Sequence, residues 1–437
     1  MDRLSNLPDE IICHIASFLS AKEAAFTTVL SKRYLNLYNI IPNLEFDGSL
    51  RSFTDFVDGV LALPASTRIK RCSLKSKGNA KQAHYAHINR CLCDVLNRGV
   101  LDLELHMFVG KRYSLPFEVF TCKTVVKLKL GNNFVINALP NNASLPALET
   151  LILDHLRFKD RYGCAFEKLL SACIVLKELT INGMEWECWK WSGNVSSPTL
   201  QRLIIHRHGD NFYEFAVARI TLNTPSLTYL ECLDVIPDEY PIVNLDSLVE
   251  AKLNLMLTVN HIYDGLVDDS DIITSNPTNL IKGLRNVQIM NLTTPTFQTF
   301  YYFNEALPVF AKLHHLTITP LDEEFCWQFL PFLIKKAPNL ETLTIDGPLH
   351  FDVTKPRSVC KCLFGYSFLF SCPLKVLHLT DYGGTIGEVK HLKHYLKKLS
   401  RLELVKLHYW QRAHDVRPPS LMIPVVPSKC KIEVTYS

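Results

Sequence analysis

The sequence predicts an α/β solenoid. We expect a three-helix module at the N-terminus, an irregular horseshoe of strand–helix repeats, and a C-terminal strand–helix–strand unit that caps the array. Three observations predict this fold class. The first 38 residues contain several helix signals, and apolar residues recur in a fixed pattern along most of the remaining chain. Beyond about residue 355 the sequence pattern changes. With 437 residues, the chain suits a small module joined to an elongated one.

The N-terminal segment contains start signals for three successive helices. Pro8 favours a first helical position, Ser20 and Glu23 have the spacing of a capping box, and Ser31 can cap a third helix. An apolar stripe at helical spacing follows the first signal and consists of Ile11, Ile12, Ile15, Phe18 and Leu19. Segments of about 40 residues rarely fold unaided, so we expect this module to pack on a neighbour, a partner or both.

The repeated pattern is six residues long and reads apolar-x-x-apolar-x-apolar. Its clearest copies start at Leu148, Leu176, Leu200, Leu313, Leu340 and Leu374, and weaker copies start at Ile69, Val100, Val125, Leu227, Leu248, Leu284 and Leu402. Steps between copies run from about 21 to about 36 residues, close to the spacing of leucine-rich repeats. A single strand–helix unit cannot bury its own apolar face, so the pattern predicts units stacked into a solenoid.

Features between the copies support this register. A proline lies two residues before the first apolar position of four copies, at Pro146, Pro198, Pro225 and Pro338. We expect it to end the preceding segment and to set the chain extended before the strand. Amphipathic stretches at 165–174 and 327–336 are suited to the outer helices of a horseshoe.

Alternation along each strand predicts which side chains face the concave side of the horseshoe. The expected lining is Asp102, Glu104, Lys127, Lys129, Glu178, Thr180, Arg202, Tyr229, Glu231, Glu250, Lys252, Asn286, Gln288, His315, Thr317, Thr342 and Thr344. This lining mixes both signs of charge. It therefore suits a protein or peptide partner better than a phosphate backbone.

Composition and charge limit the class of protein. The formal net charge is +4, which calls for neither a nucleic-acid nor a membrane partner. The sequence has no apolar run of 18 residues and no export signal at its N-terminus. Its 14 cysteines are scattered, so we expect reduced, mostly buried thiols and a cytoplasmic or nuclear location.

The sequence lacks the catalytic motifs of common enzyme classes, which predicts a non-catalytic protein without a cofactor. There is no GxSxG elbow, Gly-rich phosphate loop, HExxH or paired CxxC. The nearest approach to a zinc site is His84, His87, Cys91 and Cys93. Cys91 and Cys93 point about 200° apart on a helix, so one helix does not gather all four ligands. We expect a helix with buried thiols there, and no metal.

Residues 4 to 38 resemble the F-box, the adaptor-binding module of cullin-type ubiquitin ligases. The family pattern appears as Leu7-Pro8-Asp9-Glu10-Ile11-Ile12, Ile15, Phe18-Leu19, Lys22-Glu23-Ala24 and Ser31-Lys32-Arg33. The sequence departs from it at three positions, with Ala16 in place of Leu, Ser20 in place of Pro and Tyr34 in place of Trp. By analogy with core truncations, a Leu-to-Ala difference in a buried interface lowers affinity.

The last part of the chain resembles the FBD region that follows leucine-rich repeats in many plant F-box proteins. Cys372-Pro373-Leu374 leads into a Tyr382-Gly383-Gly384 turn, a helix-like run at 388–398 and a final strand from Leu402. The helix is rich in Lys and His, and the usual acidic ending is absent. The predicted domains are an F-box at 1–45, leucine-rich repeats at 46–354 and an FBD-like region at 355–437, as in plant F-box/LRR-repeat proteins.

The resemblance implies a substrate receptor of an SCF-type cullin ubiquitin ligase. The F-box would dock on a SKP-type adaptor and through it on a cullin, while the repeats would hold a target protein that the sequence does not identify. The residues implied in adaptor contact are Leu7, Pro8, Ile11, Ile12, Ile15, Leu19, Val29, Leu30 and Tyr34, with Lys32 and Arg33 at the rim. Two alternatives stay open: a repeat scaffold that does not engage the ligase, as the departures suggest, and a ligand-dependent co-receptor.

Overall fold

The computed structural model describes residues 40–63, 67–78, 80, 82–109, 113–131, 134–136, 138–158, 164–183, 194–206, 219–257, 259–260, 272–273, 275–321, 329–347, 372–382, 386–409 and 430–436. These belong to two compact units, Met1–Phe215 (unit 1) and Ala216–Ser437 (unit 2), and each unit is considered by itself. The three helices predicted within residues 7 to 38, and with them every residue implied in adaptor contact, lie outside the described residues.

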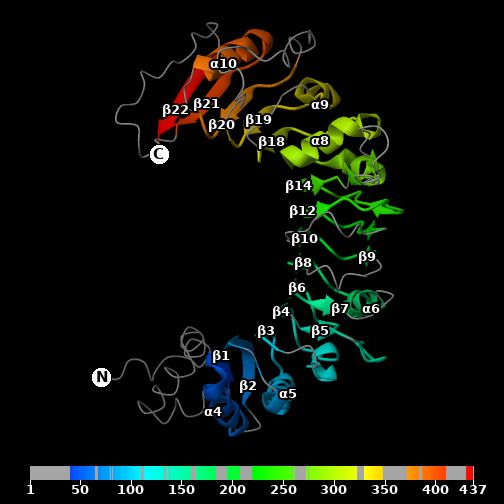
Figure 1. The fold of residues 1–437 in the computed structure, drawn as a ribbon, viewed down its shortest axis with the longest axis vertical. Coiled ribbons are helices and arrows are strands. Elements are labelled where there is room, and N and C mark those ends of the chain that lie inside the picture. Colours follow the sequence, from blue (N-terminus) through cyan, green and yellow to red (C-terminus); the bar gives the residue numbers. More distant parts are fainter. Residues whose placement is uncertain are drawn as a thin grey trace, which may run out of the picture. The chain divides into compact units, whose positions relative to one another are not determined.

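Unit 1 is built on parallel strands that pair in chain order, with helices on one side of them (Figure 1). The strands are β1 (Ile40–Ser49), β2 (Arg68–Lys77), β3 (Asp102–His106), β4 (Lys127–Gly131), β6 (Thr150–Asp154), β8 (Glu178–Asn182) and β10 (Arg202–His206). The helices are α4 (Leu50–Leu61), α5 (Gln82–Asn97), the short η1 (Phe117–Phe120) and α6 (Cys164–Ala172). Three short strands complete the unit, β5 (Val135–Ile136), β7 (Arg157–Phe158) and β9 (Asn194–Ser196).

Unit 2 repeats this arrangement with its own set of parallel strands. They are β12 (Tyr229–Val235), β14 (Glu250–Met256), β17 (Ile289–Thr293), β18 (His315–Thr319), β19 (Thr342–Ile345), β20 (Val376–Leu379), β21 (Leu404–Tyr409) and β22 (Lys431–Tyr436). The helices are α7 (Thr278–Gly283), η3 (Leu284–Asn286), α8 (Thr294–Tyr302), η4 (Asn304–Ala306), α9 (Leu330–Lys336) and α10 (Ile386–Lys398). The shorter strands are β11 (Thr221–Asn223), β13 (Val243–Asn244), β15 (Val259–Asn260) and β16 (Ile272–Ile273).

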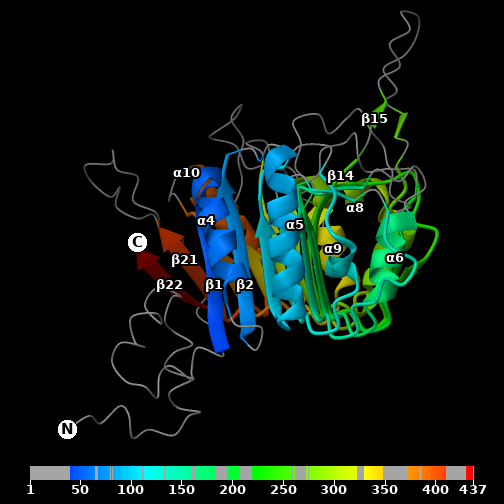
Figure 2. The same ribbon diagram turned by 90° about the horizontal axis from the view of Figure 1, so that it is seen from below.

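Alternation along each strand creates the core. On β6, β10 and β18 the second and fourth residues are buried and the others are partly exposed. The buried residues, such as Leu103 and Leu105 on β3, have no accessible surface and face the helices, which cover one face of the strands (Figure 2). The predicted outer helices at 165–174 and 327–336 correspond to α6 and α9, and the helix-like run predicted at 388–398 corresponds to α10. The six-residue pattern therefore predicted the buried positions correctly in most copies.

A tight turn precedes most of these strands. In it, the first apolar residue of the pattern donates its N–H to the carbonyl three residues earlier, as from Leu148 N to Leu145 O at 3.2 Å. Pro146, Pro225 and Pro338 occupy the second position of such turns, where the fixed φ of proline fits. The prediction that these prolines set the chain extended is therefore wrong, because each of them lies within a turn.

The same turn explains one error in the predicted register. The copy predicted to start at Leu284 places Val287 and Ile289 in the core, but the strand that follows buries Met290 and Leu292. Leu284 and Val287 instead close the turn, with Val287 N donating to Leu284 O at 3.1 Å. The true copy starts three residues later, at Val287. A turn spaced apolar-x-x-apolar imitates the first half of the pattern, and this caused the shift.

The shift also changes the predicted lining at this repeat. Asn286 ends η3 and donates its side-chain amide to Asp246 O at 3.0 Å, while Gln288 precedes the strand. The outward positions of β17 are Ile289, Asn291 and Thr293. Asn286 and Gln288 are therefore not on the outward face, contrary to the prediction.

Two strands extend the array beyond the predicted copies. β1 pairs with β2 along its length and buries Leu44 and Phe46, which follow Ile41 in the same apolar-x-x-apolar-x-apolar pattern. It spans the position between residues 45 and 46 at which the first domain boundary is predicted. β22 pairs with β21 in parallel beyond the last predicted copy, at Leu402. Within the described ranges, no helix combines the length and apolarity needed to cross a membrane.

Candidate functional site

The candidate site is the strand face that the helices leave uncovered, here called the open face. In unit 1, strand register aligns its outward side chains in rows across β2, β3 and β4. One row contains Arg71, Asp102 and Lys127, and the next contains Ser73, Glu104 and Lys129. Parallel strands lie about 4.8 Å apart, so neighbours in a row are within contact distance. The lining predicted for β3 and β4 is therefore brought together on one surface.

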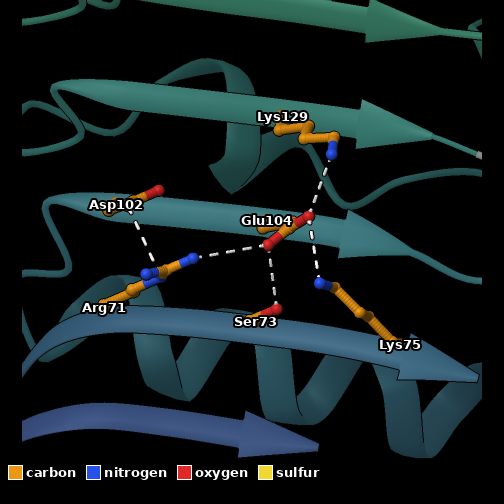
Figure 3. Close-up of polar contacts among 6 residues, drawn as sticks. All are labelled: Arg71, Ser73, Lys75, Asp102, Glu104 and Lys129. Carbon is orange, nitrogen blue, oxygen red and sulfur yellow. Dashed lines mark hydrogen bonds and ion pairs between the residues drawn. The ribbon is translucent and has the colours of Figure 1, made fainter. Parts of the chain in front are cut away.

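Glu104 lies at the centre of this surface and is enclosed by cations (Figure 3). Its carboxylate lies 3.1 Å from Lys129 Nζ, 3.4 Å from Lys75 Nζ and 3.7 Å from Arg71 Nη2. Both lysines contact Oε1, whereas Arg71 contacts Oε2, to which Ser73 Oγ also donates at 3.1 Å. The Glu104 side chain is only 9% exposed, whereas the side chains of the three cations are 32–44% exposed. A buried carboxylate therefore lies beneath half-exposed positive groups.

The environment of Glu104 keeps it ionised. Burial acts to raise its pKa, but the hydrogen bond and charge of Lys129, the hydrogen bond from Ser73 and the charge of Lys75 outweigh burial and lower the pKa to about 2. Glu104 is thus a permanent counter-ion for the cations around it. Asp102 adds a second carboxylate 3.6 Å from Arg71 Nε, and it is more exposed than Glu104.

A glycine creates space for an imidazole in the next row, which contains Lys75, His106 and Gly131. A Cβ at Gly131 would lie 2.5 Å from His106 Nδ1, so only glycine lets the ring rest across β4. Burial lowers the pKa of His106; Asp154 and Glu104 act to raise it and Lys129 and Lys75 to lower it, and the net direction is downward. His106 is therefore neutral at pH 7 and adds no positive charge to the surface.

The open face of unit 1 loses its basic character beyond β4. β6 presents Thr150, half-buried Ile152 and Asp154. Asp154 pairs with His155 at 2.8 Å. The predicted residues Glu178 and Arg202 are aligned on β8 and β10, with Glu178 exposed and Arg202 half-buried. These strands present an apolar and mixed surface rather than a basic one.

In unit 2, the predicted residues on β12 and β14 form a small cluster. Tyr229 donates its hydroxyl to Glu231, and Lys252 Nζ lies 5.6 Å from the centre of the Tyr229 ring. Burial and the Glu231 hydrogen bond raise the pKa of Tyr229, and the hydrogen bond to Tyr229 raises that of Lys252. Glu250 is half-buried on the same face. The Tyr229 side chain thus contacts a carboxylate, Glu231, and an ammonium group, Lys252.

The next strands of unit 2 present an uncharged polar face. The outward positions of β17 to β20 are Ile289, Asn291, Thr293, His315, Thr317, Thr319, Thr342, Thr344, Val376 and His378. His315 Nε2 is 3.2 Å from Thr344 Oγ1. Burial is the largest cause that lowers the pKa of both His315 and His378; His314 acts in the same direction on His315, and Lys406 does so on His378. Both imidazoles are therefore neutral at pH 7.

Unit 2 also contains an open cleft of about 780 Å³ away from these outward positions. Residues that precede the strands and residues of the turns line it: His314, Asn339, Glu341, Pro373, Lys375, Ser400, Arg401, Leu402 and Glu403. Lys375 Nζ pairs with Glu341 at 2.7 Å. Both side chains are about half exposed, so solvent screens the pair.

Sequence reasoning missed several residues of the charged surface. Arg71, Ser73 and Lys75 occupy the outward positions of β2, and the copy starting at Ile69 already contained the alternation that identifies the first two. His378 follows from the copy at Leu374 in the same way. Among the described residues, no group of His, Cys, Asp or Glu has a metal-binding arrangement. Cys91 is buried on α5, while Cys93 on the same helix is half-buried.

Comparison with known proteins agrees with this architecture. A family model described as the F-box domain matches residues 4–37, and one described as "FBD-associated F-box protein At5g56370, LRR repeats" matches residues 88–249. F-box/LRR-repeat protein At3g58980 of Arabidopsis thaliana is 62% identical over 442 residues, which cover 99% of this chain and 74% of that protein. Putative F-box/LRR-repeat protein At3g58920 of the same plant is 51% identical over 470 residues, and this alignment covers 100% of both chains.

A third relative, F-box/LRR-repeat protein At3g62440 of Arabidopsis thaliana, is 50% identical over 463 residues and is covered along its whole length. These similarities extend from the F-box match through the repeats to the end of the chain. The repeating parallel strands, the buried positions they share and the N-terminal match all point to one family. The chain belongs to the F-box/LRR-repeat proteins.

Proposed function

We propose that this protein is the substrate-recognition subunit of an SCF-type cullin ubiquitin ligase and has no catalytic role of its own. The observation that carries the proposal is the F-box match at residues 4–37 in the same chain as a leucine-rich repeat array. An F-box implies binding to a SKP-type adaptor, and a repeat array supplies an extended surface for a second protein. The chain then links a target to the ligase.

The adaptor contact is assigned to the apolar residues of the F-box. Leu7, Pro8, Ile11, Ile12, Ile15, Leu19, Val29, Leu30 and Tyr34 form its apolar part, with Lys32 and Arg33 at its rim. A standard interface buries about 800 Å² on each partner, which three short helices can supply. In this proposal the F-box is a three-helix module, the repeats form an irregular horseshoe, and the FBD-like region caps its end.

The proposed contribution to ubiquitination is proximity. Holding a target beside a ubiquitin-charged subunit raises the effective concentration of its lysines, while the covalent chemistry takes place on other subunits. On the target side, the proposed contacts are the outward residues of the strands: Asp102, Glu104, Lys127, Lys129, Glu178, Arg202, Tyr229, Glu231, Glu250, Lys252 and His315. Of these, Glu104 acts by holding its neighbours, because its own carboxylate is buried.

Co-purification with a SKP-type adaptor tests the proposal. The full chain and an Ile11→Asp, Ile15→Asp double variant are each co-expressed with the adaptor and captured through it. We expect the wild type to be retained and the double variant to be lost, since two carboxylates are costly in an apolar interface. Lys127→Gln, on the open face, is the matched control and should be retained like the wild type. Equal retention of wild type and double variant would instead indicate a scaffold that does not engage the ligase.

A further inference from the structure

The open face of unit 1 carries a compact group of exposed cations. Arg71 and Lys75 project from β2, and Lys127 and Lys129 project from β4, on both sides of β3. Lys127 is exposed, and the side chains of the other three are 32–44% exposed. The four positive groups span two strand spacings, or about 10 Å across the sheet. Here they are called the basic strip.

Glu104 organises the basic strip without neutralising it. One buried carboxylate accepts contacts from three cations, and each ammonium has three N–H donors, so further donors remain for a ligand on the solvent side. Within β2 to β4, the four cations face two carboxylates, Asp102 and Glu104, which leaves an excess of two positive charges. Fixed cations in a preorganised arrangement lose little freedom when an anion binds.

The basic strip has a boundary on each side. On the β1 side, exposed Glu45 and Asp47 are aligned with Ser73 and Lys75, so carboxylates of this chain limit the strip there. On the β6 side, Gly131 has no side chain, and Thr150 and half-buried Ile152 are uncharged, while Asp154 is aligned with Gly131 and pairs with His155 at 2.8 Å. A ligand that extends from the strip toward β6 meets an apolar side chain, whereas one that extends toward β1 meets negative charge. The two sides of the basic strip therefore favour different groups of a ligand.

We propose that the basic strip and Ile152 bind a short acidic segment of a partner protein, in which two or more carboxylates adjoin an apolar side chain. The carboxylates lie over Arg71, Lys75, Lys127 and Lys129, and the apolar side chain contacts Ile152. β2 and β6 lie three strand spacings apart, about 15 Å. An extended segment covers this distance with about five residues. The proposal deepens and rests on the proposed target-binding role, and it names the chemical class of the target segment.

Peptide binding to the full-length chain tests this proposal. A fluorescent peptide of about ten residues, with four Asp or Glu followed by Leu, is compared by anisotropy with its Asn/Gln counterpart. We expect the acidic peptide to bind at least about tenfold more tightly, and its affinity to fall as NaCl is raised from about 50 to about 300 mM, since salt screens exposed charges. Equal binding of the two peptides would overturn the proposal.

Matched variants locate the site. Lys75→Gln with Lys127→Gln removes two charges from the basic strip and should weaken binding of the acidic peptide about fivefold or more. Lys312→Gln with Lys335→Gln removes two exposed lysines from unit 2 and should leave binding unchanged. Ile152→Ser should abolish the preference for Leu over Ser in the peptide, a difference of about threefold to tenfold. Equal losses from both lysine pairs would overturn the assignment to this face.

Two further outcomes separate this proposal from others. A single-stranded oligonucleotide of the same charge should compete less well than the peptide, because it offers no apolar group adjoining the anions; equal competition would overturn the proposal in favour of general polyanion binding. The assay contains no adaptor. Loss of peptide binding with intact adaptor capture therefore refutes this inference alone, whereas loss of adaptor capture with intact peptide binding refutes the ligase role alone.

Discussion

The strands β2–β4 of unit 1 and β17–β20 of unit 2 have the same kind of buried frame, meaning the inward apolar side chains of each strand. Their open faces differ in the charge and polarity of the outward side chains. On β3 the buried apolar residues are Leu103 and Leu105, and on β18 they are Leu316 and Ile318, all without accessible surface. Outward from β3 and its neighbours lie four cations and two carboxylates. Outward from β18 and its neighbours lie threonine, asparagine, neutral histidine and aliphatic side chains.

The difference shows that fold and recognition use separate positions of one strand. Side chains at alternate positions point to opposite faces, so the outward residues can change without altering the core. A substitution in the frame should therefore cost similar stability in either unit, whereas a substitution on the open face should depend strongly on which unit contains it. Each experiment below tests a part of this separation.

The largest expected effect comes from the shared frame. Leu105→Ala on β3 and Leu316→Ala on β18 each leave a cavity at a fully buried site, and each should lower the free energy of unfolding by about 2–5 kcal/mol. Urea unfolding measures the loss, and amide hydrogen exchange shows which strands it affects. Thr317→Ala, an outward control beside Leu316, should change stability by less than about 0.5 kcal/mol. A large loss from only one of the two leucines would show that the frames are not equivalent.

The frame was accessible from the sequence because one local rule determines it. Leu151 and Leu153, or Leu343 and Ile345, are buried because a strand alternates and its register repeats. The prediction failed at Leu284, where the turn closed by the bond from Val287 N to Leu284 O has the same apolar spacing as the pattern, and the strand begins only at Ile289. The connections between strands also differ in length, so the position of one copy of the pattern does not predict the position of the next.

The chemistry of the open face was predicted only in part. Alternation identified Glu104 and Lys129 as outward residues, but it could not show that the Glu104 carboxylate is buried. That burial depends on Arg71, Ser73 and Lys75, which come close only through the register between β2 and β3. Contacts across about thirty residues of chain carry no local sequence signal. Charge on the lining was therefore predictable, whereas its organisation around one counter-ion was not.

The second effect concerns the counter-ion of the charged face. Glu104→Gln keeps the shape of the side chain but leaves Arg71, Lys75 and Lys129 without their shared carboxylate charge. Because the cations are half-exposed, the cost should be about 1–2 kcal/mol rather than that of a fully buried pair. Urea unfolding at pH 7 measures it. Glu341→Gln, which breaks an exposed pair in unit 2, should leave the unfolding midpoint unchanged.

The same carboxylate predicts a pH dependence that is confined to unit 1. The pKa of Glu104 is about 2 in the folded chain against an ordinary value of 4.5, so its stabilising effect is complete above pH 4.5 and is lost as the pH falls toward 2. The difference in stability between wild type and Glu104→Gln should therefore be constant from pH 5 to 7 and shrink by more than half at pH 3. A difference that persists at pH 3 would contradict the role of ionised Glu104.

The smallest effect tests whether the face of unit 2 is truly uncharged. Burial lowers the pKa of His378, and the charge of Lys406 lowers it further, while Asp346 acts in the opposite direction. In an NMR titration, His378 should therefore have a midpoint below 6.5, and the ring should stay neutral at pH 7. Lys406→Gln removes one of the lowering charges, so it should move the midpoint upward. A midpoint at or above 6.5 would mean that His378 becomes positive near neutral pH, and that the two open faces differ less in charge than their outward residues indicate.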